Sequence, residues 1–245
     1  MCSSLVRGQV FSTDFGSATD IATWTNIPAT TYFGTDATVG HYMIVEGAAA
    51  ATALRSTTFT ANAVACVEFD MMLPTLKSDR TTANAISGGN TCGVALMNGA
   101  TVAGVIGFRG SGSGSADHIL STGGTDYMYV TAGTKASATR DLWLHYIFLV
   151  NTTAKKGDIY IANPADGVVY SYATRYDNYI KNITALKNIG IVSNAGYSVA
   201  VANLKVTDPT VAQLTLSSKN NVVLQYIPAI GYVSTVQYSA AAKYH

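Results

Sequence analysis

Two acidic residues lie two positions apart in the stretch 64–73, VACVEFDMML. If this stretch is a β-strand, alternate side chains face opposite sides, so Glu68 and Asp70 share a face with Cys66 and Met72. The other face is apolar and would be the core face, with Ala65, Val67, Phe69 and Met71. Retaining glycosidases hold a nucleophile and a general acid about 5–5.5 Å apart, roughly the reach of same-face neighbours in a strand. The pair is therefore either catalytic or a set of structural or glycan-facing polar groups.

The histidines and glycine-rich segments provide no second catalytic constellation. His41, His118, His145 and His245 lack the paired spacing of a metal site. His145 would lie on one strand face between Trp143 and Ile147, where we expect a packed, hydrogen-bonded histidine rather than a base. The segment RGSGSGSAD (109–117) has the glycines of a phosphate-binding loop but precedes no helix, so it predicts a flexible hairpin loop.

Aromatic side chains provide another way to hold sugar, because a ring packs against the apolar face of a pyranose while polar neighbours bond the hydroxyls. Several tyrosines fall in or near predicted loops, beside polar residues. The candidate ligand-binding residues are Glu68, Asp70, Tyr127, Tyr129, Tyr176, Asp177 and Tyr179. The alternative is that these tyrosines only pack on exposed strands, where tyrosine is common.

The sequence predicts no catalytic residue and no cofactor, and one metal is considered. A structural calcium ion would use loop oxygens of Asp117, Asp126 or Asp177, although no ligand run such as D-x-D-x-D is present. The cysteines match no metal-ligand spacing. Because apolar residues surround Cys66 and Cys92, we expect buried free thiols there rather than a disulfide between them.

Composition and charge exclude several classes of partner. Charged residues make up 12% of the chain and the net charge is +1, so nothing concentrates phosphate and we expect no nucleic-acid partner. No apolar run approaches the roughly 20 residues that span a bilayer. The start, MCSSLVRGQVF, lacks the apolar centre of a secretory signal. Either a signal was removed before this numbering begins or the chain leaves its cell as a virion protein does, so we expect an extracellular or virion-surface location.

The periodicity of the apolar residues is two, and the apolar runs are short and rich in Val, Ile, Tyr and Thr, which indicates β-strands. Turn-forming clusters separate the runs, and the cluster NPADG predicts a hairpin within 155–172. About a dozen short strands close most economically as two stacked antiparallel sheets. The predicted strands are 8–14, 39–46, 52–58, 63–73, 91–98, 102–109, 127–132, 142–151, 156–162, 167–173, 188–194 and 197–207.

The order of these landmarks resembles the concanavalin A-like (laminin-G-like) jelly-roll superfamily of lectins and glucanases. The resemblance covers residues 8–208 and depends on VFSTDF, Trp24, VEFDMMLP, DLWLHYIFLVN, KKGDIYIANPADGVVYSY and GYSVAVANLKVTD. It implies a two-sheet antiparallel jelly-roll sandwich whose concave sheet or edge loops often bind glycans, sometimes with a calcium ion.

The resemblance also carries a test for catalysis. Glucanases of that superfamily have a third acid in the pattern E-x-D-x-E, and Met72 stands at that position here. Glu46 is the only other glutamate, so a replacement acid would have to be Glu46 or a loop aspartate. The sequence therefore predicts that the chain is not an enzyme, and that Glu68 and Asp70 are structural or face a glycan.

Residues 209–245 change in character after the sandwich domain, 1–208. They begin with proline, contain two or three apolar β runs, and are too short to bury a core alone, since about 40 residues is the usual lower limit without staples. We expect a C-terminal β extension or a partial immunoglobulin-like module that contacts other subunits of an assembly.

Three functions from different classes follow from these features. The favoured one is a non-enzymatic surface or virion appendage, such as a fibre, capsid decoration or adhesin, whose sandwich binds a glycan or cell-surface polysaccharide. The second is a carbohydrate-binding module of a secreted polysaccharide-degrading enzyme. The third and least favoured is a glycanase.

Overall fold

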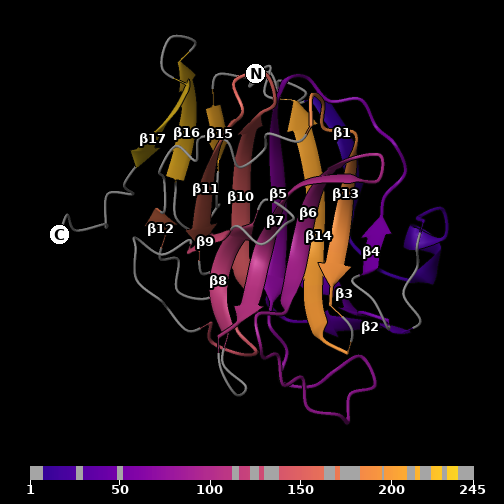
Figure 1. Ribbon diagram of the computed structural model, residues 1–245. Helices are drawn as coiled ribbons and strands as arrows, with labels where there is room; N and C mark the ends of the chain where they lie inside the picture. The colour runs from indigo at the N-terminus through magenta and orange to yellow at the C-terminus, as the bar shows by residue number, and fades with distance from the viewer. Residues whose placement is uncertain are drawn as a thin grey trace.

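The computed structural model describes residues 8–25, 30–48, 52–111, 116–121, 127–129, 138–162, 169–171, 183–194, 196–208, 213–215, 222–227 and 231–236. Within these ranges the chain forms β-strands and one 3-10 turn, η1 (Ala18–Ile21). Two antiparallel sheets stack face to face, as Figure 1 shows. The predicted all-β, two-sheet antiparallel sandwich is confirmed.

The larger sheet contains eight strands: β1 (Gly8–Thr13), β2 (Thr30–Asp36), β3 (Gly40–Glu46), β5 (Val64–Met72), β10 (Leu144–Asn151), β11 (Lys156–Ala162), β12 (Val169–Ser171) and β14 (Ser198–Asp208). Their order across the sheet is β12-β11-β10-β5-β14-β3-β2, and β1 also pairs with β14. The acid-bearing strand β5 therefore lies in the middle of the sheet.

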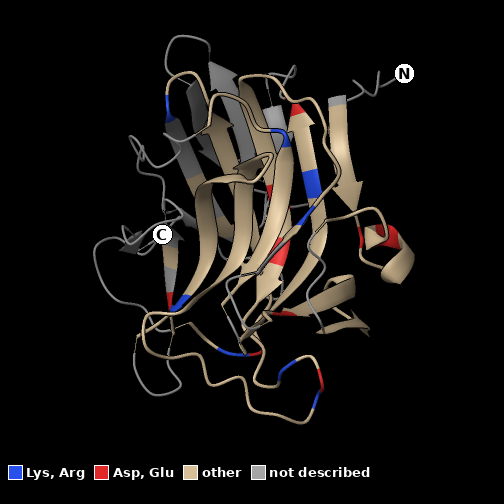
Figure 2. Cartoon of the chain, turned by 45° about the vertical axis from the view of Figure 1, so that its right-hand side comes forward, with Lys and Arg blue, Asp and Glu red and all other residues tan. Residues whose placement is uncertain are grey.

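The smaller sheet contains six strands: β4 (Thr52–Arg55), β6 (Thr91–Asn98), β7 (Thr101–Gly110), β8 (Ala116–Ser121), β9 (Tyr127–Tyr129) and β13 (Asn188–Ser193). Their order is β4-β13-β6-β7-β8-β9. Figure 2 shows that Lys, Arg, Asp and Glu are sparse on the strands of the sandwich. The few charged side chains that the strands carry are therefore candidates for a functional site.

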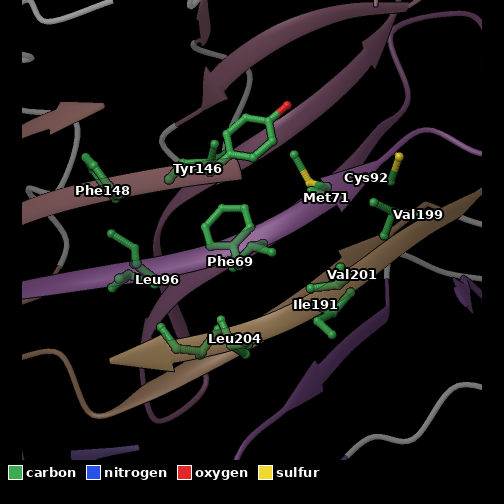
Figure 3. Packing of buried hydrophobic residues seen from close by; sticks show 14 of the residues in the cluster. Phe69, Met71, Cys92, Leu96, Tyr146, Phe148, Ile191, Val199, Val201 and Leu204 are labelled. Atoms are coloured by element: carbon green, nitrogen blue, oxygen red, sulfur yellow. The ribbon is translucent and has the colours of Figure 1, made fainter. Parts of the chain in front are cut away.

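The core lies between the two sheets and uses the apolar face of β5 as the alternation predicts. Ala65, Val67, Phe69 and Met71 are all fully buried. The ring of Phe69 stacks on the ring of Tyr146 from β10, with centroids 5.2 Å apart and planes at 7°, and Figure 3 shows the two rings facing each other. This packing fixes β5 against β10 in one register.

The strand predictions hold for most of the sandwich. β10 lies between β5 and β11, as its two apolar faces predict, and β11 pairs with β12 as the predicted hairpin. Two strands, β2 and β8, fall outside the predicted list. β8 begins inside the segment 109–117, which the sequence predicts as a loop, and β7 continues into that segment as far as Gly110.

Both cysteines within the described residues, Cys66 and Cys92, are buried and form no disulfide, which confirms the prediction of buried thiols. Burial raises the pKa of the Cys92 thiol to about 12, against the opposing charge of Arg140. A thiol with that pKa is protonated at neutral pH and is a poor nucleophile. Cys92 therefore serves packing rather than chemistry.

The C-terminal region contributes a separate three-stranded sheet, with β15 (Gln213–Thr215), β16 (Val222–Ile227) and β17 (Gly231–Val236) in that order. Figure 1 draws these strands in yellow as a group of their own. In the part of the chain that the structure describes, they form strand pairs with one another only. No helix among the described residues is long and apolar enough to cross a membrane.

Candidate functional site

A pocket of about 710 Å³ opens where the larger sheet splits. The first part of β14, Ser198–Val201, pairs with β3, and the last part, Leu204–Asp208, pairs with β1. Between these two pairings β14 changes its neighbour. The pocket lies at this point on the outer face of the larger sheet, where β5 presents Glu68 and Asp70. Its lining residues are Ser12, Thr13, Asp14, Asp20, Glu68, Asp70, His145, Asn203, Leu204 and Lys205.

A bulge in β14 brings two of its polar side chains to the acids of β5. Asp70 pairs with Ala202 and Glu68 pairs with Lys205, so β14 advances three residues while β5 advances two. A bulge of this kind re-aims the side chains around it. Asn203 adopts a φ of 51°, in the left-handed region that asparagine tolerates better than most residues.

The two carboxylates of β5 have different partners. Asp70 Oδ1 lies 2.7 Å from Nδ1 of His145, and Asp70 Oδ2 accepts a 2.6 Å hydrogen bond from the amide of Asn203. Glu68 Oε1 lies 3.2 Å from Nζ of Lys205, and Glu68 Oε2 lies 4.0 Å from Nε2 of His145. The imidazole therefore stands between the two acids, with one ring nitrogen toward each.

Electrostatics favour the charged form of His145. Burial disfavours the imidazolium, but the hydrogen bond to Asp70, the charge of Asp70 and the charge of Glu68 outweigh burial and the opposing charge of Lys205. The pKa of His145 is accordingly raised above its ordinary value. About 20% of the His145 side chain is exposed, against 10% for Glu68 and 8% for Asp70. The imidazole is thus the most accessible of the three groups.

Met72, the last residue on the outer face of β5, belongs to an apolar cluster beside the pocket. It packs with Tyr42, Trp143 and smaller buried residues. The ring of Trp143 meets Tyr42 edge-on, with centroids 5.4 Å apart. A third carboxylate at position 72 would be buried among these rings without a partner, which is costly. The packing of this cluster explains why an apolar residue stands there.

Carboxylates outnumber cationic groups around the pocket. The rim adds Asp14 and Asp20, which are exposed and accept hydrogen bonds from the backbone N–H groups of Gly16 and Ser17. Carboxylates accept hydrogen bonds from sugar hydroxyls but repel other carboxylates. The pocket therefore suits a neutral polyhydroxylated ligand better than an anionic one.

The structure places the candidate ligand-binding residues in different regions. Glu68 and Asp70 lie in the pocket, whereas Tyr127 and Tyr129 belong to β9, the edge strand of the smaller sheet. Tyr176, Asp177 and Tyr179 lie outside the described residues. A ligand site that includes these tyrosines stays a prediction.

The calcium candidates do not form a site among the described residues. Asp117 is buried in β8, and Asp126 and Asp177 lie outside the described ranges. In those ranges no three His, Cys, Asp or Glu side chains are grouped so that they could hold a metal ion. The structural calcium ion therefore stays a prediction without a described ligand set.

Sequence reasoning missed most of the polar partners of the acids. It expected a hydrogen bond for His145 without identifying Asp70 as the acceptor. Asn203 and Lys205 escaped notice because the bulge that brings them to β5 leaves no mark in the apolar alternation. The replacement acid sought at Glu46 is absent from the pocket lining, because Glu46 ends β3 and binds Lys77 and Ser78.

The His145–Asp70 pair should make stability depend on pH. Because the folded-state pKa of His145 is raised above the unfolded value of 6.5, its contribution is fully present below that value and is lost as pH rises through the folded pKa. Denaturant titrations across this range should show the free energy of unfolding falling in the wild type. The fall should be smaller in His145→Gln and unchanged in the matched control His41→Gln, and equal slopes in all three proteins would contradict the prediction.

No protein-family model matches the chain, and no curated protein matches its sequence. Among solved structures, the catalytic domain of a glycoside hydrolase family 131 protein from Coprinopsis cinerea is 12% identical, with a TM-score of 0.51 over 83% of this chain and 96% of that one. A GH131 beta-glucanase catalytic domain from Podospora anserina is 10% identical, with a TM-score of 0.50 over 86% of this chain and 88% of that one. A xylan beta-1,4-xylosidase from Bacillus halodurans aligns more loosely, with a TM-score of 0.44 at 7% identity, over 68% of this chain and only 33% of that enzyme's length.

These likenesses concern the fold, and they overturn one prediction. The sequence analysis excluded an enzyme because Met72 breaks the acid triplet, and this exclusion is wrong. Two structures of this fold are glycoside hydrolase catalytic domains, so a fold of this kind is compatible with hydrolase chemistry. The exclusion sought a replacement acid only at Glu46 or in a loop aspartate, whereas β10 and β14 bring the titratable groups His145 and Lys205 to Glu68.

Proposed function

We propose that the chain is a glycoside hydrolase of the jelly-roll type, related in fold to the concanavalin A-like group, that cleaves a neutral glycan in the pocket of β5. The observation that carries the proposal is the position of Glu68. Its carboxylate lies on the pocket wall with one oxygen held by Lys205 and the other directed toward His145. A carboxylate and a protonatable group side by side on the wall of an open pocket are the two groups that glycosidic cleavage requires.

Substrate binding would use the groups around this pair. Asp14 and Asp20 at the rim can accept hydrogen bonds from sugar hydroxyls, and Ser12 and Thr13 can donate or accept them. The carboxylate-rich lining supports a neutral glycan and disfavours a polyuronate. The split in the larger sheet leaves the pocket open on one side. An open pocket suits a polysaccharide chain better than a small ligand that is enclosed on all sides.

The test measures turnover on a panel of β-glucans and galactans. Turnover is detected as the release of reducing ends. We expect hydrolysis of at least one polymer and a loss of about 10³-fold or more in kcat/KM for Glu68→Gln. Glu46→Gln, which alters the one other glutamate and lies outside the pocket, should keep wild-type activity. Absence of turnover on the whole panel, or turnover that survives Glu68→Gln, would refute the proposal.

A second role concerns residues 209–245. We infer that these residues attach the sandwich to other subunits at an extracellular or virion surface, where its glycan partner is found. Support comes from the separate pairing of β15, β16 and β17 with one another. A single small sheet is marginal in water unless one face is covered, and a neighbouring subunit would provide that cover.

A further inference from the structure

We propose that the proton donor of this site is His145 rather than a carboxylic acid, that Glu68 is the nucleophile, and that Asp70 and Asn203 are positioning residues for the imidazole. The inference rests on the proposed function and goes beyond it by assigning the roles. It also accounts for Met72, since a donor from β10 makes a third acid on β5 unnecessary.

The hydrogen bonds of Asp70 favour a positioning role over the role of acid or nucleophile. Both of its oxygens are occupied, Oδ1 by His145 at 2.7 Å and Oδ2 by Asn203 at 2.6 Å. The same amide of Asn203 donates to the backbone oxygen of Val39 at 2.9 Å, which ties it to the residue before β3. Asp70 is therefore held from two sides, and its remaining role is to orient the imidazole.

The orientation of the imidazole follows from this clamp. With Nδ1 bound to Asp70, the free nitrogen is Nε2, and it lies 4.0 Å from Oε2 of Glu68. A ring nitrogen held by a carboxylate fixes which nitrogen faces the reaction. The distance between donor and nucleophile is nearer the short separation of retaining glycosidases than the roughly 6.5–9.5 Å of inverting ones, which must also accommodate a water molecule.

The reaction then balances in two steps. In the first, Glu68 Oε2 attacks the anomeric carbon, the bond from that carbon to the glycosidic oxygen breaks with its electron pair on oxygen, and His145 Nε2–H protonates that oxygen. In the second, neutral His145 takes a proton from water, the resulting hydroxide attacks the anomeric carbon, and the ester bond to Glu68 breaks. The enzyme returns to carboxylate and imidazolium, and the net change is the addition of one water.

The charges that face His145 suit this role. Asp70 and Glu68 approach it from β5, Lys205 from β14, and Asp14 and Asp20 line the same pocket from the segment around η1. Its strand partner on β11 is Ala162, which carries no charge. The acids outnumber the single lysine, and the raised pKa of His145 keeps the imidazole protonated further toward neutral pH. The alkaline limb of kcat/KM should therefore report His145.

The test compares two leaving groups on the sugar that the polymer panel identifies. An oligosaccharide leaving group needs protonation, whereas 2,4-dinitrophenolate departs without it. His145→Ala should lower kcat/KM by about 10²–10⁴-fold on the oligosaccharide and by less than about 10-fold on the dinitrophenyl glycoside. Glu68→Gln should lose both activities, and the control His41→Ala should lose neither.

Positioning by Asp70 and Asn203 has its own readouts. Asn203→Ala should lower kcat with little change in KM, because Asp70 loses the donor that holds its second carboxylate oxygen. Asp70→Asn should lower the imidazole pKa of His145. NMR titration of the protein without substrate measures this pKa. A merely structural role would change stability and the titration of His145 but would leave kcat unchanged.

The possible outcomes separate the two proposals. His145→Ala could lower kcat/KM equally on both substrates, or on neither, while Glu68→Gln abolishes turnover. In that case the donor assignment is wrong and the hydrolase proposal stands. If Glu68→Gln retains turnover, the hydrolase site itself is wrong, and the donor assignment falls with it. Chemical-shift dispersion like that of the wild type in each variant verifies that loss of activity is not loss of folding.

Discussion

Replacing Trp143 with alanine should lower the free energy of unfolding by about 3–5 kcal/mol, the usual cost of removing a large buried aromatic side chain. Trp143 is only 5% exposed and packs against Tyr42 and Met72 on the outer face of the larger sheet. The cavity left behind would be lined by residues of β3, β5 and β14, which are paired side by side in the larger sheet, and this pairing limits relaxation. Denaturant unfolding with an unchanged slope is the appropriate measurement.

Tyr32→Ala provides the matched comparison for this prediction. Tyr32 packs at the edge of the same cluster but is partly exposed, with the guanidinium of Arg80 5.4 Å from its ring centre. Its removal should cost about 1–2 kcal/mol, since less area leaves the interior. A loss below about 1 kcal/mol for Trp143→Ala would contradict the position of Trp143 in a sealed cluster.

The sequence predicted those parts of the fold that local patterns determine. Alternation along β5 identified Ala65, Val67, Phe69 and Met71 as the core face. The turn-forming residues NPADG predicted a hairpin, and β11 and β12 do pair antiparallel. β2 was missed because Gly34 and Asp36 weaken its strand pattern. The structure gives a reason for the glycine: a Cβ at position 34 would lie 2.6 Å from Cζ of Tyr42, so the close packing of the tyrosine ring excludes any larger residue.

The sequence predicted only the part of the site that lies on a single strand, β5. Glu68 and Asp70 were placed on one face because their spacing is local. His145 reaches Asp70 through the pairing of β10 with β5, and the contacts of Asn203 and Lys205 depend on a bulge with a residue at positive φ. Neither the pairing nor the bulge can be read from alternation. The exclusion of an enzyme failed for the same reason, since it sought only a replacement acid and could not place His145 or Lys205 beside Glu68.

Deleting residues 209–245 should leave a folded sandwich that no longer self-associates or attaches to its partner. β14 ends at Asp208, whose Oδ1 accepts a 2.7 Å hydrogen bond from the backbone N–H of Asn62. Its last residues are also paired with β1 and β5. The final strand of the sandwich is thus anchored before the tail begins, so truncation after Asp208 removes no strand from either large sheet.

The measurements are sedimentation and thermal unfolding of the full chain and of the truncated chain. We expect the full chain to form oligomers and the truncated chain to be a monomer, with cooperative melting in both. Turnover in the pocket should survive truncation, because all of its lining residues precede the deletion. If the truncated chain unfolds while the full chain is a stable monomer, β15, β16 and β17 stabilise the sandwich itself. The apolar strands of the tail would then be covered within one chain, and the attachment role of 209–245 would lose its physical basis.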